Sequence, residues 1–552
     1  MKNFYSCTML LLASFLGFSQ ITPVTYRGAF APAPAAMWTA GWTNFDPQNA
    51  VYPLPTAANV VNVTANITSN TTWIASNVYY LKGQTYVKNN AILTIEAGTV
   101  ILGDHTAVGA GLFITKGSKV IAIGTATSPI VFTSDKPAGS RNKGDWGGIV
   151  LLGKATYNIN GGVNNIEGIA ATADTEFGGG TTPDDADNSG TLKYVRIEFG
   201  GYIYAANQEI NGLTFGAIGS GTTIDNVQVS FANDDSFEWF GGSVNCSHLV
   251  SFRGLDDDFD TDNGFSGKVQ FGLGVRDPQI SDNPTVSTSN GFESDNNAQS
   301  TGTSPAFTTC VFSNVTIVGP HFRQTLPFGG TIAAGFGRAA QLRRNSKQKI
   351  FNTIFMDYNN GLHVDGVTTE TNALNNDLKF KNNILASNVA NKIAYVNATG
   401  NNASFVIATW YAASNNTTIA TNAGILTAPY NLTDAQIYTG LDYRPSATSI
   451  AATGADFTDS ALLANNTNDF IALVATVYPN PSATNFKLMY SAISTENVEL
   501  SITDLTGRNI ETKSIEYNMA ENFEFGNNLT AGVYLVQIRQ GQAVKTIKVI
   551  KN

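Results

Sequence analysis

A gapless repeat around two acidic clusters most constrains how this chain can fold. The stretch NDDSFEWFGG at 233–242 aligns with LDDDFDTDNG at 255–264, so that Glu238 corresponds to Asp260. A period of about 20 residues built only of strands and turns is typical of solenoids, in which each repeat forms one coil. We therefore predict an all-β chain whose main part is a right-handed parallel β-helix, with Val, Ile, Leu and Phe stacked inside it.

Two further patterns support a solenoid. The stretch 91–104 resembles 111–124, with Gly98 matching Gly117, and strand-like runs begin at Asn226, Asn314 and Asn352. Asparagine tolerates the left-handed turn conformation, and its amide can form ladders between coils. The alternative is a β-sandwich or a propeller, but a sandwich requires hairpin turns about every 8–12 residues. Asn-Gly pairs are spaced much more widely than that in this chain.

The composition fits an extracellular β protein. Only 13% of the 552 residues are charged, 43% are hydrophobic, and the formal net charge is −10. An acidic surface disfavours nucleic acid and anionic membranes as partners, because both carry negative charge. It suits cations, neutral glycans or basic proteins.

The N-terminal stretch, MKNFYSCTMLLLASFLGFSQ, combines a basic start with a short apolar run. The run is too short for a transmembrane helix, so the pattern predicts a secretory signal peptide cleaved near Gln20. No later stretch of the sequence resembles a membrane span. We expect this organisation along the chain: signal peptide 1–20, lead-in 21–60, β-helix 61–400, irregular coils and linker 401–476, and a separate domain 477–552.

Cleavage of the signal peptide would remove Cys7 and leave Cys246 and Cys310 in the mature chain. An exported protein can join two cysteines in a disulfide. Two separate buried thiols are the alternative. The sequence leaves both open, because it does not give the distance between the two positions.

The character of the sequence changes at Val477. A turn at Pro479-Asn480-Pro481 precedes a strand, an alternating strand ends at a turn containing Gly507, and the chain ends in a hairpin with lysines on its last strand. Lysine on an edge strand discourages pairing with other chains. These features predict a small C-terminal β-sandwich.

The order and spacing of these motifs resemble the type A C-terminal sorting domain of the type IX secretion system of Bacteroidetes-like bacteria. The residues that match are Pro479, Asn480, Pro481, Asp504, Leu505, Gly507, Arg508, Leu529, Gly532, Val533, Tyr534 and the strand from Lys545 to Lys551. The resemblance implies export through the periplasm, recognition by the type IX secretion machinery and removal of the tail. The mature protein would then be released or attached at the cell surface.

The central region resembles parallel β-helix proteins that use the same pathway. The stretches that carry this resemblance are LTIEAGTVI, GDWGGIVLLG, GLDDDFDTDNGFSGKVQFG and NGFESDNN. It implies a fold and a compartment, but no reaction.

Five aspartates fall between positions 256 and 262. On adjacent coils, equivalent positions lie about 4.8 Å apart, and two carboxylates about 4 Å apart repel by about 4 kcal/mol at a surface dielectric near 20. Calcium accepts roughly six to eight oxygen ligands in irregular geometry and would relieve this repulsion. We predict a calcium site formed by Asp256, Asp258, Asp260, Asp262 and Asn263.

Two other acidic stretches are weaker candidates for ligands. Asp184, Asp185 and Asp187 offer a second calcium loop in DDADNSG. Glu293 and Asp295 in GFESDNN are expected to be solvated surface residues, because acidic side chains are mostly exposed.

Parallel β-helices also carry polysaccharide lyases and glycoside hydrolases, although this is an analogy at the level of the fold. In that alternative two carboxyl groups act as acid and base. The candidates are Asp235, Glu238, Asp257 and Asp260, with Arg253 and His248 beside them. The motif set of pectin hydrolases is incomplete, because the chain has no Gly-His-Gly. Whether the protein is an enzyme stays open.

Trp239, next to Glu238, is the best candidate for stacking on a sugar ring, although tryptophan more often fills a core. Our first hypothesis is an exported, non-catalytic module for adhesion or for binding polysaccharide or cell-surface glycans, with calcium stiffening the acidic coils. The alternative is a polysaccharide-degrading enzyme that uses the same carboxyl groups.

Overall fold

The computed structural model describes residues 21–205, 208–285, 287–297, 306–322, 331–387, 392–430, 440–463, 475–490, 497–516, 523–540 and 543–552. The predicted signal peptide and Cys7 lie outside the described residues. The chain divides into two compact units, Met1–Asn466 and Thr467–Asn552. The division falls within the stretch 401–476, where we expected a linker.

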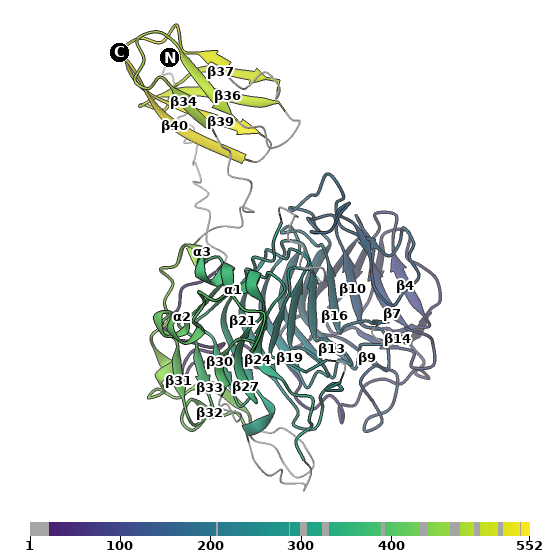
Figure 1. The fold of residues 1–552 in the computed structure, drawn as a ribbon. Coiled ribbons are helices and arrows are strands. Elements are labelled where there is room, and N and C mark those ends of the chain that lie inside the picture. Colours follow the sequence, from purple (N-terminus) through teal and green to yellow (C-terminus); the bar gives the residue numbers. More distant parts are fainter. Residues whose placement is uncertain are drawn as a thin grey trace, which may run out of the picture. The chain divides into compact units, whose positions relative to one another are not determined.

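The first unit is a parallel β-helix, in which successive coils lie side by side (Figure 1). Each coil adds one strand to a parallel sheet that we call the front sheet. In spatial order, its described strands are β4 Gln84–Val87, β7 Gly111–Ile114, β10 Ile149–Leu152, β16 Leu213–Gly216, β18 Phe237–Phe240, β20 Phe259–Asp262, β22 Phe292–Ser294, β24 Arg338–Leu342, β27 Asn360–Val364 and β30 Lys392–Tyr395.

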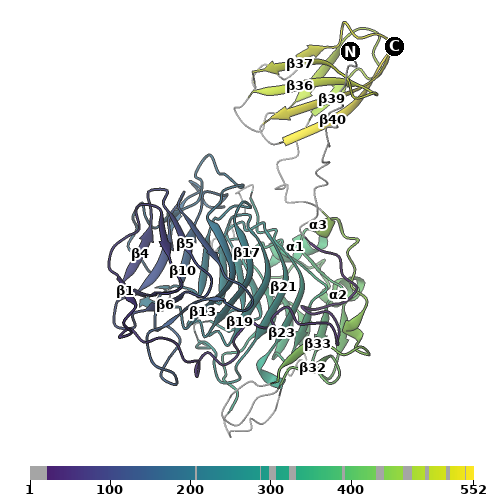
Figure 2. The same cartoon turned by 180° about the vertical axis from the view of Figure 1, so that it is seen from behind.

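The remaining strands of the coils form a second parallel sheet, the back sheet (Figure 2). In the middle coils it has one long strand per coil, and towards both ends two short strands replace it. Its described strands are β1 Val60–Val63, β2 Thr71–Trp73, β3 Val78–Leu81, β5 Ile92–Ile95, β6 Val100–Gly103, β8 Lys119–Ile123, β9 Ile130–Ser134, β13 Gly190–Glu198, β17 Thr223–Ser230, β19 Asn245–Phe252, β21 Lys268–Val275, β23 Val311–Val318, β25 Lys349–Phe351, β26 Ile354–Met356, β28 Lys379–Lys381, β29 Ile384–Ala386 and β31 Thr417–Ile419.

The gapless alignment of the two acidic stretches is confirmed residue by residue. Strands β18 and β20 pair so that Phe237 lies beside Phe259 and Glu238 beside Asp260. The phenylalanine row continues to Phe292, with ring centroids 5.7 and 5.3 Å apart inside the β-helix. Because side chains alternate along a strand, the aromatic row faces the core and the acidic row faces outward.

The looser repeat between residues 91–104 and 111–124 does not correspond to one coil of the β-helix. Leu93 of β5 pairs with Val120 of β8, which belongs to the next coil. Gly98 and Gly117 both have a φ of 84°, but Gly98 lies between β5 and β6 and Gly117 between β7 and β8. The predicted equivalence of these two glycines is therefore wrong, because it matched two similar corners at different places in the coil.

The asparagine positions form a row of left-handed residues along the back sheet. Asn226, Asn314 and Asn352 have φ values of 55°, 56° and 52°. His248 and Phe271 occupy the same position of the intervening strands, with φ values of 55° and 62°. The shape of the coil thus requires the left-handed conformation at this position, and asparagine is among the residues that tolerate this conformation best.

Residues 21–52, which we call the strap, pack along the outside of the back sheet. The backbone N–H of Gly28 donates to the carbonyl of Asn352 at 2.7 Å. Trp42 is fully buried among apolar side chains that point out of this sheet, including Phe252. The strap, which makes up most of the predicted lead-in 21–60, is therefore a packed part of the first unit.

Loops and short helices interrupt the coils, and α1 and α2 lie at the late, green end of the β-helix in Figure 1. A long excursion, residues 153–189, separates β10 from β13. The described elements outside the two sheets are β11 Asn164–Asn165, β12 Glu176–Phe177, β14 Ile203–Ala205, β15 Gln208–Glu209, η1 Pro320–Phe322, α1 Val367–Leu374, α2 Ile407–Ala413, β32 Leu426–Ala428, β33 Asp442–Pro445, η2 Ile450–Ala452 and α3 Ser460–Leu463.

The second unit is the predicted β-sandwich. Its two antiparallel sheets share one apolar core, and Gly507 has a φ of 85° at the turn between two of the strands. The described strands are β34 Ala475–Tyr478, β35 Phe486–Tyr490 and β38 Phe523–Phe525 in one sheet, and β36 Val498–Asp504, β37 Asn509–Ile515, β39 Gly532–Gln540 and β40 Ala543–Lys551 in the other. Across the described parts of both units, no helix is long and apolar enough to cross a membrane.

Candidate functional site

One row of outward-facing positions, which we call the front row, runs along the whole front sheet. The first coils of the row carry aromatic and apolar residues, the middle coils acidic residues, and the last coils polar and aromatic residues. Strand register places the members in this order: Tyr86, Phe113, Val150, Thr214, Glu238, Asp260, Glu293, Gln341, His363 and Tyr395.

The excursion 153–189 covers the apolar part of the front row. Phe113 and Val150 are fully buried in a cluster with Tyr157 and Phe177 of this excursion. The apolar part is therefore a second small core. The acidic and polar part remains as the candidate site.

The acidic middle contains the side chains of Glu238, Asp260 and Glu293 on three consecutive coils. Asp235 and Asp257 stand at the turns that lead into the first two of these strands. The backbone N–H of Asp257 donates to the carboxylate of Asp235 at 2.7 Å, and the turn of the following coil binds Asp257 in the same way. Each turn is thus tied to a carboxylate of the coil before it.

Asn211 is a member of this site that the sequence did not reveal. Its side-chain N–H donates to the carboxylate of Glu238, and its side-chain oxygen accepts from the backbone N–H of Asp235 at 3.2 Å. It occupies the corresponding turn one coil earlier, where an amide replaces the acid. A search for acidic repeats passes over it for that reason.

Three overlapping groups of carboxylates converge. In each of them the oxygens that could act as ligands lie within 4.8 Å of one another. One carboxylate oxygen of Asp256 and one of Asp260 are buried without a hydrogen-bond donor in the described part of the chain. Clustered acceptors without donors call for protons or a cation. The groups are Asp234, Asp235 and Asp256; Asp235, Glu238 and Asp260; and Asp257, Asp260 and Glu293.

Burial raises the pKa of these carboxyl groups, and neighbouring carboxylates raise it further. The pKa of Asp256 rises to about 6 and that of Glu293 to about 8. For Asp235, Glu238 and Asp257 the pKa also lies well above the ordinary range. At neutral pH these oxygens can therefore hold protons, and a cation that bound there would have to displace them.

Glu293 and Asp295 are part of this acidic site, not the solvated surface residues that we expected. Both are buried, and Arg343 forms ion pairs with both. Arg344 pairs with Asp295 at 2.6 Å. The repeat alignment did not reach them, because the coil that leads into β22 is longer than the one that leads into β20.

A cavity of about 340 Å³ adjoins the acidic residues on the side of the later coils. Its wall is polar and carries three guanidinium groups and one carboxylate. The lining residues are Pro284, Thr285, Ser287, Thr288, Glu293, Arg338, Gln341, Arg343 and Arg344.

The structure does not bring together the five predicted calcium ligands. Residues 259–262 of the predicted calcium site form a strand, β20, so that neighbouring side chains point to opposite sides of the sheet. Asp258, just before this strand, is fully buried and lies 3.2 Å from the guanidinium of Arg276. It therefore neutralises a buried base.

Asp262 and Asn263 also make local bonds. The carboxylate of Asp262 accepts from the backbone N–H and from the side-chain N–H of Asn263, both at 2.6 Å. Of the five predicted ligands, only Asp256 and Asp260 belong to the convergent groups of the described chain.

The second predicted calcium loop binds backbone groups. Asp185 accepts from the backbone N–H of Thr156 at 2.8 Å, and Asp187 from that of Lys154 at 3.0 Å. Asp184 is exposed and accepts from a backbone N–H of its own turn. Asp185 and Asp187 thus fasten the end of the excursion to its first residues, just after β10. None of the three carboxylates belongs to a convergent group in the described residues.

Trp239 is not available for stacking on a sugar. The alternation that turns Glu238 outward turns Trp239 inward, where it is fully buried between Phe215 and Phe265 at centroid distances of 5.1 and 5.3 Å. Cys246 and Cys310 are both free and buried, so the disulfide alternative is not realised.

His248 and Arg253 do not belong to the front row. His248 lies on β19 of the back sheet, with its Nδ1 atom 2.8 Å from the carboxylate of Asp225. Arg253 forms an ion pair with Asp277. The alternative catalytic set is thus reduced to its carboxyl groups.

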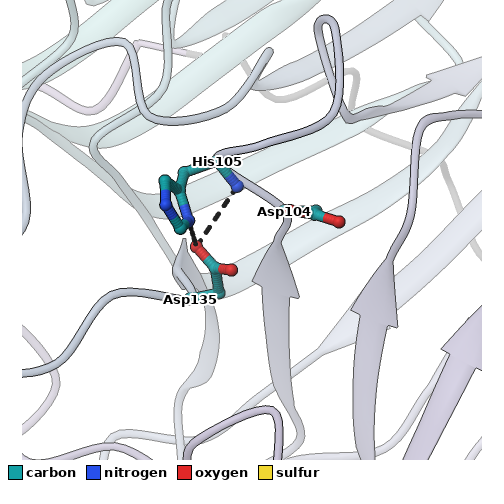
Figure 3. Close-up of side chains that lie close together, drawn as sticks. All are labelled: Asp104, His105 and Asp135. Carbon is teal, nitrogen blue, oxygen red and sulfur yellow. Dashed lines mark hydrogen bonds and ion pairs between the residues drawn. The ribbon is translucent and has the colours of Figure 1, made fainter.

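Figure 3 shows a second group of possible metal ligands, Asp104, His105 and Asp135, which bond to each other or to neighbouring side chains. Asp104 and Asp135 follow β6 and β9 at equivalent corners, and the Nδ1 atom of His105 lies 2.7 Å from Asp135. Tyr80 donates to the other oxygen of Asp135 at 2.8 Å, and Lys82 pairs with Asp104. Burial alone would raise the pKa of Asp104, but its bonds to Lys82 and to the hydroxyl and backbone N–H of Thr106 lower the pKa to about 2. This group needs no cation.

A parallel β-helix with outward carboxylates on successive coils, followed by a separate C-terminal β-sandwich, defines the class as a two-unit β-helix protein. The chain belongs to the family of pectate-lyase-like beta helix domains, whose family model matches residues 65–427. A secretion system C-terminal sorting domain matches residues 476–552, which confirms the resemblance to type IX secretion substrates. The protein is therefore secreted or exported to the cell surface. No curated protein matches the chain.

Proposed function

We propose that the acidic middle of the front row binds calcium and that the front row holds a polysaccharide without cleaving it. One observation carries the proposal: carboxylates from successive coils converge within 4.8 Å, and a buried oxygen of Asp260 has no donor in the described residues. Calcium prefers oxygen ligands and tolerates irregular geometry, so it fits this donor set.

The residues that would hold the ion are Asp235, Glu238 and Asp260, or Asp257, Asp260 and Glu293. A bound ion supplies positive charge, which offsets the repulsion between stacked carboxylates and attracts glycan oxygens. The chain itself fixes the ligands, because the backbone of one coil binds the carboxylate of the previous coil.

In this proposal the glycan lies along the front row, across several coils. Coils recur about every 4.8 Å, a distance close to the length of one sugar residue. At the late end of the row, the ring of Tyr395 stacks on His363 with centroids 4.5 Å apart. Aromatic faces of this kind offer apolar contact to sugar rings.

Cleavage is the second candidate, and Glu293 is the observation that favours it. Burial raises the pKa of Glu293 to about 8, so this group can hold the proton that a general acid donates. Its nearest oxygen lies within 4.8 Å of those of Asp257 and Asp260. Inverting hydrolases separate their carboxyl groups by about 6.5–9.5 Å, so the spacing favours a retaining reaction.

The test compares binding and turnover by the full mature protein on a panel of polysaccharides, with calcium or with a chelator. We expect calcium-dependent binding without products. Asp260→Asn should lose it, whereas Asp184→Asn, which alters an exposed carboxylate of the excursion, should retain it. Equal binding with and without calcium would refute the proposal. New reducing ends or unsaturated products that disappear in Glu293→Gln would establish the second candidate.

A further inference from the structure

We infer that the cavity beside the acidic residues is a separate anion site, which takes a sugar residue carrying a carboxylate or a sulfate group. Arg338 binds the anionic group, and Gln341 accepts a hydrogen bond from a neighbouring hydroxyl group. The inference rests on the proposed function in one respect, namely that the ligand is a glycan. It does not require a cation.

The charges on the cavity wall are unequal. Of the three arginines, Arg343 is paired with Glu293 and Asp295, and Arg344 is paired with Asp295. Arg338 forms no ion pair in the described part of the structure. Arg338 is therefore the guanidinium of the wall that has no carboxylate at ion-pair distance in the described residues.

Neutral groups hold Arg338 in place. Its Nε atom donates to the hydroxyl of Tyr395 at 3.0 Å, and one terminal nitrogen donates to the hydroxyl of Thr288 at 2.9 Å. The other terminal nitrogen has no acceptor in the described residues. A positioned guanidinium with a free N–H group is well suited to a carboxylate or a sulfate oxygen.

Gln341 is a second, independent indication of a ligand. It lines the cavity, the residue is only 5% exposed, and its Oε1 atom has no donor among the described residues. His363, the next residue of the front row, also has a buried side-chain atom without a partner in the described residues. Its Nε2 atom lies 3.0 Å from the side-chain oxygen of Asn397, and its buried Nδ1 atom has no partner in the described chain.

Buried acceptors without donors are unfavourable, and a ligand rich in hydroxyl groups can supply the donors. A simple inorganic anion would satisfy Arg338 but leave Gln341 unpaired. A neutral sugar would do the reverse. A sugar with an anionic substituent satisfies both, which defines the chemical class of the ligand.

The test uses residues 21–552, which retain the second unit, in chelator, so that any cation site is empty. The probes are glucuronate and glucose 6-sulfate, with methyl glucoside as the neutral control, and binding is followed by calorimetry or NMR. We expect at least one of the anionic sugars to bind about tenfold more tightly than methyl glucoside, or better. Binding of one alone identifies the anionic group as carboxylate or sulfate.

Arg338→Gln should weaken binding of the anionic sugar by about tenfold or more. The matched control is Arg508→Gln, which removes an exposed arginine of the second unit and should change nothing. Gln341→Leu should weaken binding of the anionic sugar but not of inorganic sulfate. It should leave the melting temperature unchanged or raised, because Oε1 has no hydrogen bond to lose.

Equal affinity for neutral and anionic sugars would overturn the inference, and so would unchanged affinity in Arg338→Gln or the absence of any binding at about 50 mM sugar. Asp260→Asn should abolish calcium-dependent glycan binding and leave the binding of anionic sugars at Arg338 unchanged, so this variant separates the two proposals. Anion binding that depends on Arg338 while calcium has no effect would refute the calcium site alone. Calcium-dependent glycan binding without any effect of Arg338→Gln would refute the anion site alone.

Discussion

The backbone N–H of Asp257 donates to the carboxylate of Asp235, its equivalent on the previous coil, at 2.7 Å. The bond fixes one oxygen of each turn carboxylate through the fold itself. The turn carboxylates beside the front row are therefore held close together before any ion or ligand arrives. Such preorganisation has measurable consequences.

Calcium is expected to raise the melting temperature of the protein. A ligand that binds only the folded state adds about 2.7 kcal/mol when its concentration is about 100 times the dissociation constant. Asp260→Asn should remove most of this gain, and Asp184→Asn should keep it. Thermal unfolding in chelator and in millimolar calcium measures the effect, and a melting temperature that ignores calcium would refute the metal site.

Without calcium, the protein should lose stability as the pH rises from about 5 to 8. Burial raises the pKa of Asp256 to about 6, of Asp262 to about 7 and of Glu293 to about 8. In this window the folded state binds more protons than the unfolded state, so the contribution is present at low pH and lost as the pH passes the folded pKa. Each group adds a slope of at most about 1.4 kcal/mol per pH unit.

Urea unfolding in chelator at pH 5 and pH 8 checks this dependence. Calcium should weaken it, because the ion replaces protons on the same oxygens. A chelated protein that is equally stable at both pH values would contradict the raised pKa values.

Arg276→Met should destabilise the first unit by about 3–5 kcal/mol, because it leaves the buried carboxylate of Asp258 without its ionic partner. Adding Asp258→Leu should restore much of the loss, since neither charge of the pair then remains. Chemical denaturation of the single and the double variant provides the comparison. A single variant as stable as Arg508→Met would show that the pair contributes nothing.

Trp42→Ala in the strap should cost about 3–5 kcal/mol, because the indole is fully buried against the back sheet. Glycan binding by the remaining folded protein should not change, since the front row lies on the other sheet. Trp410→Ala is the control: this indole is only partly buried, and a smaller loss is expected. Equal losses would mean that the strap is loosely attached.

Deletion of residues 476–552, which match the sorting domain, should trap the protein in the periplasm of a host that has the type IX system. Fractionation and immunoblotting show where the β-helix accumulates. The same tail fused to an unrelated soluble reporter should bring that reporter to the cell surface or the medium. Export of the truncated protein would mean that another segment carries the signal.

The coil register was predictable from the sequence where the coils are short and of equal length. The alignment of Glu238 with Asp260 needs no gap, so a single turn of the coil returns the chain to the same position. The row continues through Glu293 and Gln341, but longer loops precede these residues and hide the equivalence. A sequence repeat is visible only where successive coils have the same number of residues. Strands of unequal coils still stack in register, but their equivalence cannot be read from a fixed period.

Two errors at the site have separate physical origins. Acidic spacing suggested that Asp258 was a ligand, and an aromatic beside an acid suggested that Trp239 was exposed. Strand alternation explains the second error, because Glu238 and Trp239 point to opposite sides of the sheet. The first was not accessible to sequence reasoning, because the partner of Asp258 is Arg276, which follows β21 of the back sheet.

The excursion 153–189 leaves the pairing of β10 with β16 intact on either side of it. The β-helix therefore tolerates insertions at this point. Natural variation can lengthen, shorten or replace the excursion without changing how the coils stack. Related proteins can thus change the ligand that they bind through sequence changes in this excursion, while the β-helix itself stays the same.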